Sequence, residues 1–476
     1  MGFTATEQRS RQAGSAVPNR KLLLISYLFP PVGGIGVQRA LSLAKYLPGE
    51  GYDVHVLQAR NAAGPVLDPG LLKHVPPAVT LHSAFAPEIP FHLRHLAWKW
   101  LSDSKRRQTV EPSASRTRNQ SKSLLGRIAG RVFCPEPEVL WAPFAIRKAR
   151  RIIERHGIEA VLVTAPPFSA FLVGNALKRQ FPKLKLISDF RDEWLSFYLK
   201  DFEFQSSDYT RRRAEAIERQ TVELSDLVVA VARFSLREIR GRYPEQPDSK
   251  FLLLPNGYDP EAFEGFTPRR HQGPGVIVTH VGTAYKTASP RYYLDALDAM
   301  PEEIRSRIET RFVGRIAETE RPVFESRKSP VSMLGFKPQS EALREMEETD
   351  YLLLTMTNDI SLPGKLFEYM ATGKPILALS PPGGEVDRIL RETRAGWCVP
   401  HDDPAAIRTM IAQACELARA GKVPPTPNWE AIRSYERPKL TAAYGRAIYR
   451  LLESADGRAF PEAARPLQFS SSSRQK

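Results

Sequence analysis

Short apolar runs that end in turn residues recur along the first half of the chain. The run KLLLISY at residues 21–27 stops at two prolines and a glycine-rich loop, and a helical pattern with one apolar face follows. Gly51 ends this helix, and a second apolar run at residues 53–57 begins a new strand. A strand, a helix and a second strand in this order form one βαβ unit of a parallel sheet. The pattern therefore predicts an α/β domain.

The same alternation continues towards the middle of the chain. Apolar runs bounded by turn residues predict further strands, and helical patterns lie between them. The predicted strands cover residues 160–164, 184–188, 227–231 and 251–254, and the clearest helices cover residues 144–156 and 209–224. In open parallel sheets, ligands bind at the carboxyl ends of the strands. We therefore look for chemistry in the loops that follow these strands.

A polar passage rich in proline and glycine, at residues 267–275, separates this half from a second one. Strand and helix alternation begins afresh after it, which predicts a second α/β domain. Its strands are expected at residues 276–280, 311–313, 331–334, 351–355, 375–379 and 397–399. We expect domains over residues 21–256 and 257–434, a final helix over 435–456, disordered ends at 1–20 and 457–476, and a mobile basic loop at about 102–130.

Size and composition agree with two globular domains. The chain has 476 residues, of which 42% are apolar and 25% are charged. It holds no run of about eighteen apolar residues able to span a bilayer, and its first twenty residues lack the apolar stretch of a secretory signal. We therefore expect a cytoplasmic protein. Its three cysteines (Cys134, Cys398 and Cys415) suit neither a disulfide framework nor a zinc site, and we interpret them as reduced thiols.

The positive charge of the chain is concentrated in the first half. The formal net charge is +15, and thirteen Lys or Arg stand against four Asp or Glu between Phe91 and Arg150. No helix-turn-helix, zinc-finger or RNA-recognition pattern accompanies this excess, so we do not expect a nucleic-acid partner. Two interpretations stay open: a solvated basic loop, or docking to the anionic inner face of the cell membrane.

The loop after the first strand has the character of a phosphate-binding loop. In PPVGGIGVQR, at residues 30–39, Gly33 and Gly34 let the backbone approach a ligand, and the next helix turns free N–H groups towards an anion. The same glycines are also compatible with a tight turn alone. The first loop of the second half offers a partner, because Gly282 and Thr283 close its first strand and Lys286 is placed to reach a diphosphate. The alternative for Lys286 is an ordinary surface lysine.

The strongest candidate site is SLPGKLFEYMA at residues 361–371. It predicts a helix with Ser361 as N-cap and a proline at an early helical position. Gly364, Lys365 and the free amides of the first turn suit a diphosphate, and Glu368, on the neighbouring face, suits two vicinal ribose hydroxyls. The alternative is that Glu368 only balances the helix dipole.

These motifs together resemble a known family. The stretch PGKLFEYMATGKPILAL, the NGYD at residues 256–259, the glycine loop, and DFRDEW at residues 189–194 are similar to glycosyltransferase family 4 and related GT-B enzymes of bacterial surface-polysaccharide assembly. The resemblance runs from about residue 21 to residue 452. It implies two Rossmann-like domains that face each other across a cleft, a nucleotide-sugar donor on the C-terminal domain, an acceptor on the N-terminal domain, and a final helix that crosses back to the first domain.

The resemblance also implies roles for single residues. Glu368 matches the second, ribose-binding glutamate of the E-x7-E motif of the family, whereas the position of the first glutamate holds Ile360. Asp359 stands beside it, one residue out of phase, so the contact to the donor sugar is open. Some relatives with a P-x-K-x-x-E-Y helix also lack the first acid, and in them the lysine is placed at the diphosphate, which matches Lys365.

Sugar transfer needs positive groups at the leaving diphosphate, and Lys365, Lys286 and the Gly33–Gly34 loop are the candidates. The chain shows no D-x-D motif in a suitable loop, so we expect no metal ligands and a metal-independent reaction on a UDP- or GDP-linked donor. The resemblance favours retention of configuration.

An inverting reaction would need a base, for which Asp192 and Asp189 are the available carboxylates. The alternative for both is structural, as a helix cap or as a partner of Arg191.

Other functions use the same features. An isomerase such as a sugar-nucleotide 2-epimerase would need no acceptor, and a catalytically silent protein would bind the nucleotide sugar only. The tryptophans beside the basic region, Trp98, Trp100 and Trp141, favour a bulky, lipid-linked saccharide acceptor instead.

Overall fold

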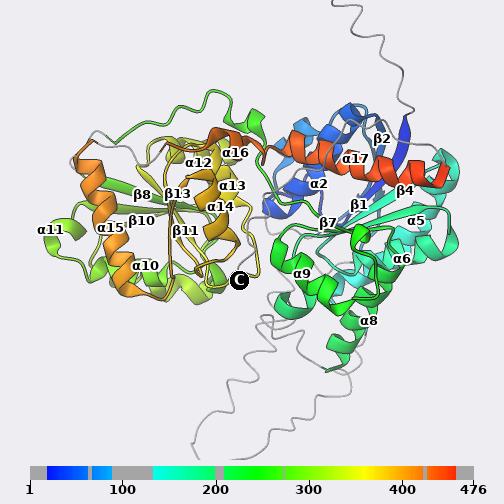
Figure 1. The fold of residues 1–476 in the computed structure, drawn as a ribbon, viewed down its shortest axis with the longest axis horizontal. Coiled ribbons are helices and arrows are strands. Elements are labelled where there is room, and N and C mark those ends of the chain that lie inside the picture. The colour runs from blue at the N-terminus through cyan, green and yellow to red at the C-terminus, as the bar shows by residue number, and fades with distance from the viewer. Residues whose placement is uncertain are drawn as a thin grey trace, which may run out of the picture. The chain divides into compact units, whose positions relative to one another are not determined.

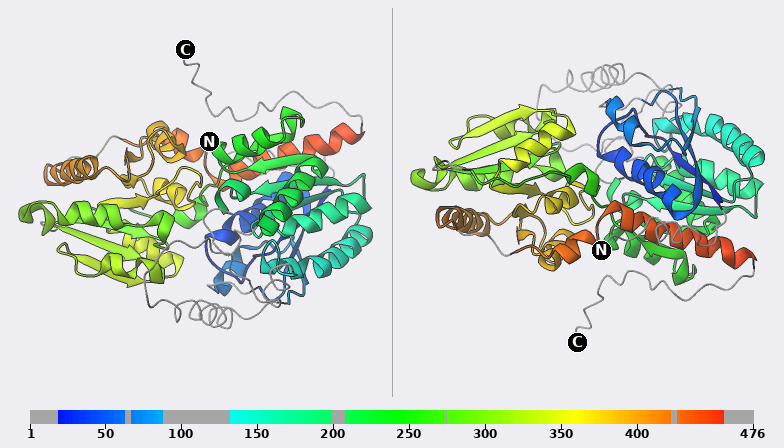
Figure 2. Two further views of the ribbon diagram at one scale, coloured as in Figure 1. Left: turned by 90° about the horizontal axis from the view of Figure 1, so that it is seen from below. Right: turned by 90° about the horizontal axis from the view of Figure 1, so that it is seen from above.

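The computed structural model describes residues 19–62, 67–87, 132–198, 208–271, 273, 275–421 and 426–456. The chain forms two compact units, each built from a parallel sheet and helices (Figures 1 and 2). Unit 1 comprises Met1–Ala230, Ile239–Leu252 and Thr441–Lys476, and unit 2 comprises Val231–Glu238 and Leu253–Leu440. The predicted basic loop at residues 102–130 and both predicted disordered ends lie outside the described residues, apart from residues 19 and 20.

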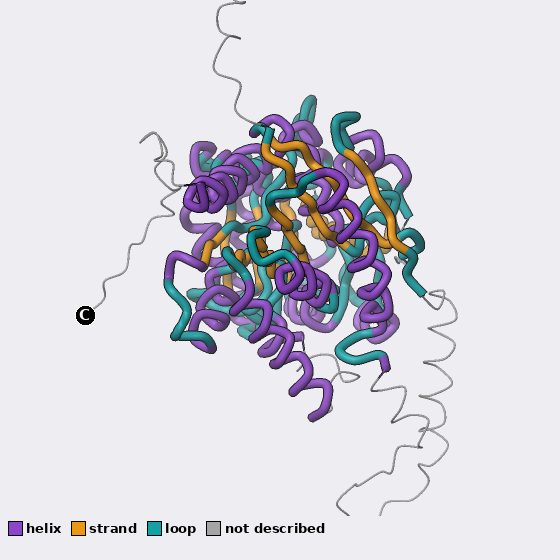
Figure 3. The backbone as a smooth tube through the Cα atoms, turned by 90° about the vertical axis from the view of Figure 1, so that its right-hand side faces the viewer, coloured by secondary structure: helices purple, strands orange, loops and turns teal. Residues whose placement is uncertain are grey.

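Unit 1 holds a seven-stranded sheet in the order β3-β2-β1-β4-β5-β6-β7. The strands are β1 (Arg20–Ser26), β2 (Tyr52–Ala59), β3 (Thr80–Ala84), β4 (Ala160–Ala165), β5 (Lys185–Phe190), β6 (Leu227–Ala230) and β7 (Phe251–Leu253). The main helices are α2 (Ile35–Tyr46), α5 (Ala142–His156), α6 (Ala170–Gln180), α8 (Asp208–Leu224) and most of α17 (Arg437–Asp456). Helix α9 (Arg233–Arg242) is divided between the two units. In Figure 3 the strands of this unit lie between helices.

The continuous apolar runs of the sequence explain this arrangement. Four successive residues of β1, from Leu22 to Ile25, are fully buried, so both faces of the strand are covered. On one face Leu23, Ile25 and Val163 join a core with residues of α5 and α6. The final helix α17 belongs to unit 1 from Thr441 onwards, and the backbone carbonyl of Gly445 in this helix accepts a 2.6 Å hydrogen bond from the Tyr52 hydroxyl.

Unit 2 holds a six-stranded sheet in the order β10-β9-β8-β11-β12-β13. The strands are β8 (Val276–Val281), β9 (Ile308–Val313), β10 (Val331–Gly335), β11 (Tyr351–Thr355), β12 (Ile376–Leu379) and β13 (Gly396–Val399). The helices are α10 (Arg291–Asp298), α11 (Glu302–Arg305), α12 (Gln339–Glu347), α13 (Lys365–Ala371), α14 (Glu385–Thr393), α15 (Pro404–Arg419) and α16 (Trp429–Arg433). Residues of α10 and α15 pack on β8, β11 and β12 in one apolar core.

The order of strands reverses once in each sheet. Strand β1 pairs with β2 on one side and β4 on the other, and β8 pairs with β9 and β11, all in parallel. The connections on the two sides of such a strand leave in opposite directions, which opens a crevice beyond its carboxyl end. In this fold, the loops after β1, β4, β8 and β11 are therefore the places to look for bound ligands.

All of the predicted strands are present, most within two residues of the predicted bounds. Strand β3 was not predicted, because its sequence TLHSA lies at the edge of the sheet and only its last residue is buried. Among the described residues, no helix combines the length and the apolar character needed to cross a bilayer.

Candidate functional site

The loop after β8 in unit 2 brings a glycine against a lysine. Gly282 follows the strand with φ +128°, a conformation that favours glycine. A Cβ atom at this position would lie 3.2 Å from Nζ of Lys365. The absence of a side chain at Gly282 thus lets the ammonium group of Lys365 lie directly on the backbone of the loop.

A buried histidine holds the lysine in place. Nζ of Lys365 lies 3.1 Å from Nε2 of His280, and Nδ1 of the same ring lies 3.0 Å from the backbone oxygen of Leu353. A carbonyl oxygen only accepts hydrogen bonds, so this network assigns the ring proton to Nδ1, and Nε2 accepts from Lys365. Burial and the neighbouring ammonium lower the pKa of His280 well below its usual range. His280 is therefore a neutral, fixed acceptor.

The same surroundings tune the lysine. Burial lowers the pKa of Lys365 to about 8, and the nearby carboxylate of Glu368 opposes part of this shift. Lys365 is thus predominantly protonated at neutral pH, and His280 accepts one of its three N–H groups. The other two can donate to an anionic ligand.

The start of helix α13 differs from the prediction. The helix begins at Lys365 with Gly364 at its N-cap, so Ser361 is not the capping residue and Pro363 precedes the helix. Ser361 instead belongs to a turn in which Oδ1 of Asn358 accepts from the backbone N–H groups of Ile360 (3.2 Å) and Ser361 (3.4 Å). The side chain of Asn358 thus forms a local turn that competes with the helix for these residues, and the helical pattern of the sequence gave no sign of this turn.

Glu368 lies one turn along α13 and is half-buried. Its Oε1 is 4.0 Å from Nη2 of Arg437, whose Nε donates to the backbone oxygen of Gly257 (3.0 Å). Burial raises the pKa of Glu368, and Arg437 and Lys365 oppose this shift. Within the described part of the chain, no hydrogen-bond donor reaches its carboxylate. Its oxygens can therefore accept hydroxyl groups of a ligand. Sequence reasoning missed His280 and Arg437.

The remaining predicted residues of unit 2 are less constrained. Lys286 begins a short 3-10 helix (Lys286–Ala288), and both Lys286 and Thr283 are exposed. The ammonium of Lys286 forms no ion pair or hydrogen bond with a described residue. Asp359 is exposed and lies against Gly384, where an added Cβ atom would be 3.0 Å from its own Cβ. Of the two candidate cations, only Lys365 is positioned by other side chains.

In unit 1, the predicted glycine loop leads into helix α2. Gly34 is the N-cap residue with φ 92°, and no side chain caps the helix. Gly33 is buried and Gly34 is exposed. Uncapped N–H groups at the start of a twelve-residue helix suit an anion, and the phosphate contact of this loop stays a prediction.

Asp189 is fully engaged with other residues of unit 1. It is buried in β5, where Arg39 donates from Nη2 to Oδ1 (2.8 Å) and from Nε to Oδ2 (2.9 Å). The hydroxyl of Thr164 donates to Oδ2 at 2.7 Å. Tyr444 of α17 is buried nearby, and burial together with the charge of Asp189 raises the pKa of its hydroxyl well above the usual range. These contacts favour the structural interpretation of Asp189, with Arg39 rather than Arg191 as its partner.

Asp192 is the more available of the two carboxylates. It follows β5, is half-buried, and makes no side-chain hydrogen bond in the portion of the chain that is described. Burial raises its pKa, and the neighbouring Arg191 opposes this shift. The guanidinium of Arg191 itself donates to the backbone oxygens of Gly36 and Pro166, which ties the loop after β4 to the start of α2.

One proposed acceptor contact is wrong. Trp141 is 1% exposed and packs edge-on against Tyr27, with ring centroids 5.2 Å apart at an interplanar angle of 90°. It is a core residue and is not available to a lipid-linked acceptor. Trp98 and Trp100 lie outside the described residues.

Comparison with known proteins assigns both halves of the chain. Residues 32–262 match the family Glycosyltransferase Family 4, and residues 275–416 match the family Glycosyl transferases group 1. Over 86 residues, the chain is 36% identical to the probable glycosyltransferase WbjE of Pseudomonas aeruginosa and 31% identical to the amylovoran biosynthesis glycosyltransferase AmsK of Erwinia amylovora. These matches span 17% of this chain and only 22% and 21% of the two relatives.

Solved structures share the whole architecture. Sucrose-phosphate synthase from Thermosynechococcus elongatus superposes with a TM-score of 0.63 at 15% identity, and covers 92% of this chain and 100% of its own. HepE of Anabaena, solved in complex with UDP and glucose, gives a TM-score of 0.58 at 14% identity, with coverage of 90% and 100%. At this level of identity the likeness concerns the fold. With both halves matched to families, the chain belongs to the family 4-like GT-B glycosyltransferases.

Proposed function

We propose that this protein transfers a sugar from a nucleotide-sugar donor to a saccharide acceptor during the assembly of a cell-surface polysaccharide. The observation that carries the proposal is the group in unit 2 formed by Lys365, His280 and Glu368. It combines a positioned cation with a carboxylate that has no internal hydrogen-bond donor among the described residues. These are the two chemistries that a nucleoside diphosphate requires, one for its phosphates and one for its ribose hydroxyls.

Lys365 is proposed to stabilise the leaving group. As the bond from the sugar to the diphosphate breaks, negative charge grows on the phosphate oxygens, and a fixed ammonium in a partly desolvated site lowers the energy of that state. His280 keeps the ammonium in position without competing for its charge, because the imidazole is neutral. The uncapped start of α2, next to Gly33 and Gly34, is the proposed phosphate contact of unit 1.

Glu368 is proposed to bind the ribose. Its carboxylate can accept both vicinal hydroxyls, and Arg437 at 4.0 Å opposes the rise in pKa that burial causes. HepE of Anabaena, which shares the fold, has been solved with UDP-glucose, and this supports UDP rather than GDP as the nucleotide of the donor. Gly282, Thr283, Gly364 and Lys286 are the proposed neighbours of the diphosphate.

We further propose a metal-independent, retaining transfer of a hexose. Asp189 is already bound by Arg39 and Thr164, which makes it a weaker candidate for the base of an inverting reaction and supports retention. Asp192 is proposed to contact the hydroxyl of the acceptor that attacks. NMR of the product gives the anomeric configuration, and an inverted product would assign Asp192 as the base instead. Transfer at 25 °C should continue at the same rate in EDTA.

The proposed acceptor is lipid-linked, and the proposed location is the cytoplasmic face of the cell membrane. Helix α5 exposes Arg147, Arg150 and Arg151, and the exposed Phe144 of the same helix contacts the exposed Phe85 edge-on at 5.5 Å. Basic side chains beside exposed aromatic rings suit an anionic bilayer. Replacement of the three arginines by alanine should weaken the affinity for phosphatidylglycerol vesicles, measured by sedimentation, by about 100-fold. Unchanged sedimentation would remove α5 from the proposal.

The test of the proposed function is acceptor-dependent release of nucleotide. The purified protein is incubated with UDP- and GDP-sugars, with and without a lipid-linked oligosaccharide extract, and both free nucleotide and the identity of the sugar are measured. A transferase releases UDP only when acceptor is present. Isomerisation of the sugar nucleotide without acceptor would indicate an epimerase, and binding without any release would indicate a silent binding protein.

A further inference from the structure

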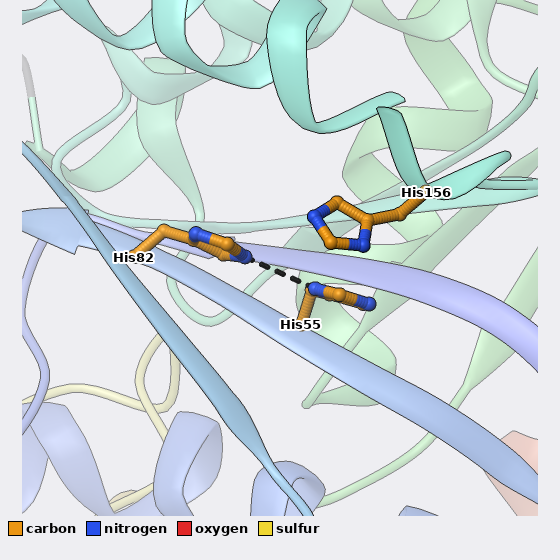
Figure 4. A group of neighbouring side chains, drawn as sticks. All are labelled: His55, His82 and His156. Atoms are coloured by element: carbon orange, nitrogen blue, oxygen red, sulfur yellow. Dashed lines mark hydrogen bonds between the residues drawn. The ribbon is translucent and has the colours of Figure 1, made fainter. Parts of the chain in front are cut away.

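Three histidines from distant parts of the sequence meet on the sheet of unit 1 (Figure 4). His55 lies on β2, His82 lies on the edge strand β3, and His156 is the last residue of α5. One nitrogen of each ring lies within 4.8 Å of the corresponding nitrogens of the other two. The closest pair is Nδ1 of His55 and Nε2 of His82, at 3.0 Å.

The group is distinct from the proposed donor and phosphate contacts. His55 pairs with Leu23 in the middle of β1, and not with the residues that lead into the glycine loop. The backbone oxygen of His156 accepts from Nζ of Lys21, at the beginning of β1. The histidines therefore lie on the body of the sheet, away from the carboxyl ends of its strands.

The rings combine fixed positions with access to solvent. His55 is 3% exposed, and His82 and His156 are half-buried. The ring centroids of His55 and His156 are 4.5 Å apart, with the planes tilted by 47°. Rings tilted in this way can direct nitrogens from different sides towards one point, which Figure 4 shows for His156 above the other two.

Several cations lie close to the group. Lys148 and Arg155 act on His82, and Lys21 acts on His55. These cations oppose a divalent ion and limit its affinity.

One carboxylate supports His55 from behind. Oδ1 of Asp53 lies 3.7 Å from Nε2 of His55, the nitrogen that points away from His82. Histidines that bind metals commonly present their second nitrogen to a carboxylate, which fixes the ring and makes the ligating nitrogen more basic. Asp53 also offsets part of the positive charge around the group.

We propose that His55, His82 and His156 bind one Zn²⁺ ion, with water as the fourth ligand. Zinc–nitrogen bonds of about 2.0–2.1 Å in a tetrahedral site place the nitrogens roughly 3.3 Å apart, so small side-chain rotations suffice. The ion would join the edge strand β3 to β2 and to the end of α5. Its role is structural, because it closes the part of the chain between His82 and His156 and protects an exposed sheet edge.

Zinc binding is tested on the full chain after removal of metals with EDTA. Titration calorimetry with ZnCl2 should give one ion per chain, and the thermal midpoint of unfolding should rise by roughly 4 °C or more in excess zinc. Co²⁺ should give the visible absorption of a tetrahedral site. His82→Ala and His156→Ala should each lose at least tenfold in zinc affinity, and Asp53→Asn should lose about tenfold. His74→Ala, which removes an exposed histidine of the same unit, is the matched control.

Two results would overturn the proposal. One is a wild-type protein that gains neither bound zinc nor thermal stability at micromolar zinc. The other is unchanged one-to-one binding in the His82→Ala and His156→Ala proteins, which would place the ion elsewhere. Circular dichroism in EDTA establishes that the variants fold, and His82→Gln and His156→Gln replace any variant that does not. Neither result bears on sugar transfer.

Discussion

Two acidic side chains, one in each unit, differ in how far the protein itself satisfies their hydrogen-bonding capacity. Asp189 lies near the carboxyl end of β5 in unit 1, and its oxygens are bound by Arg39 and Thr164 at 2.7–2.9 Å. Glu368 lies near the start of α13 in unit 2, where its Oε1 is 4.0 Å from Nη2 of Arg437 and no described residue donates a hydrogen bond to it. The first carboxylate is saturated by the protein, whereas the second retains its capacity to accept hydrogen bonds.

The contrast separates stability from binding. A buried carboxylate with a full set of donors fixes the elements around it, and here the pair of Asp189 and Arg39 joins β5 to α2. A half-buried carboxylate without donors loses part of its hydration. The lost hydrogen bonds are replaced only when a ligand supplies hydroxyl groups. Asp189 and Glu368 were both candidate site residues in the sequence, but only Glu368 keeps carboxylate oxygens that a ligand can use.

Replacement of Lys365 by alanine tests the binding side of this contrast and should have the largest effect. Loss of the positioned ammonium should reduce kcat/KM for transfer by about 10²–10³-fold, because the developing charge of the diphosphate loses its main partner. Lys328→Ala is the matched control, since this exposed lysine of the same unit is not among the proposed contacts of the donor, and we expect less than about a threefold loss. Steady-state kinetics measure both. Equal losses in the two variants would contradict the distinction.

Replacement of Asp189 by alanine tests the stability side. It leaves the guanidinium of Arg39 buried without its counter-charge, which should destabilise unit 1 by about 3–5 kcal/mol. Glu368→Gln should change the free energy of unfolding by less than about 1 kcal/mol, because no hydrogen bond from a described residue is lost. Urea unfolding of the two variants gives the comparison. A small effect of Asp189→Ala, or a large effect of Glu368→Gln, would break it.

The pH dependence of transfer should show the smallest effect. On the alkaline side of the profile, kcat/KM should fall by about tenfold per pH unit. Lys365 has a pKa of about 8 in the free protein, so kcat/KM should be level below about pH 7 and fall above about pH 8 as the ammonium loses its proton. Lys365→Arg, which stays charged, should be slower but should lack this decline. A decline at the same pH in the arginine variant would assign it to another group.

The same shift affects stability with a defined sign. The pKa of Lys365 is lower in the folded protein (about 8) than its ordinary value of 10.5, so between these values the unfolded chain binds more protons. The unliganded protein should therefore gain stability as pH rises from about 8 to 10.5. Bound diphosphate, which favours the ammonium, should reduce this gain.

The fold could be predicted almost completely from the sequence. Continuous apolar runs such as LLLI in β1 and YLLL in β11 are typical of strands buried on both faces, and the turn residues after them mark the ends. Strand β3 was not predicted because an edge strand needs few apolar residues and so leaves a weak pattern in the sequence. The start of α13 was misplaced because the side chain of Asn358 closes a turn that resembles a helix cap.

The candidate site could be predicted only in part. Lys365 and Glu368 stand in one short motif, and the helical spacing brings them together. Their partners come from other elements: His280 is 85 residues from Lys365. Arg39 and Asp189 are 150 residues apart, so only the folded sheet reveals that this carboxylate is occupied. The three histidines of unit 1 were missed for the same reason.

The most direct test of the central claim is the binding of UDP by unit 2, measured by titration calorimetry on the full chain. Wild-type protein should bind one UDP, Lys365→Ala and Glu368→Gln should each weaken this binding by roughly tenfold or more, and Asp192→Asn should leave it unchanged. Equal affinity in the wild type, Lys365→Ala and Glu368→Gln would contradict the assignment of these two residues to the nucleotide.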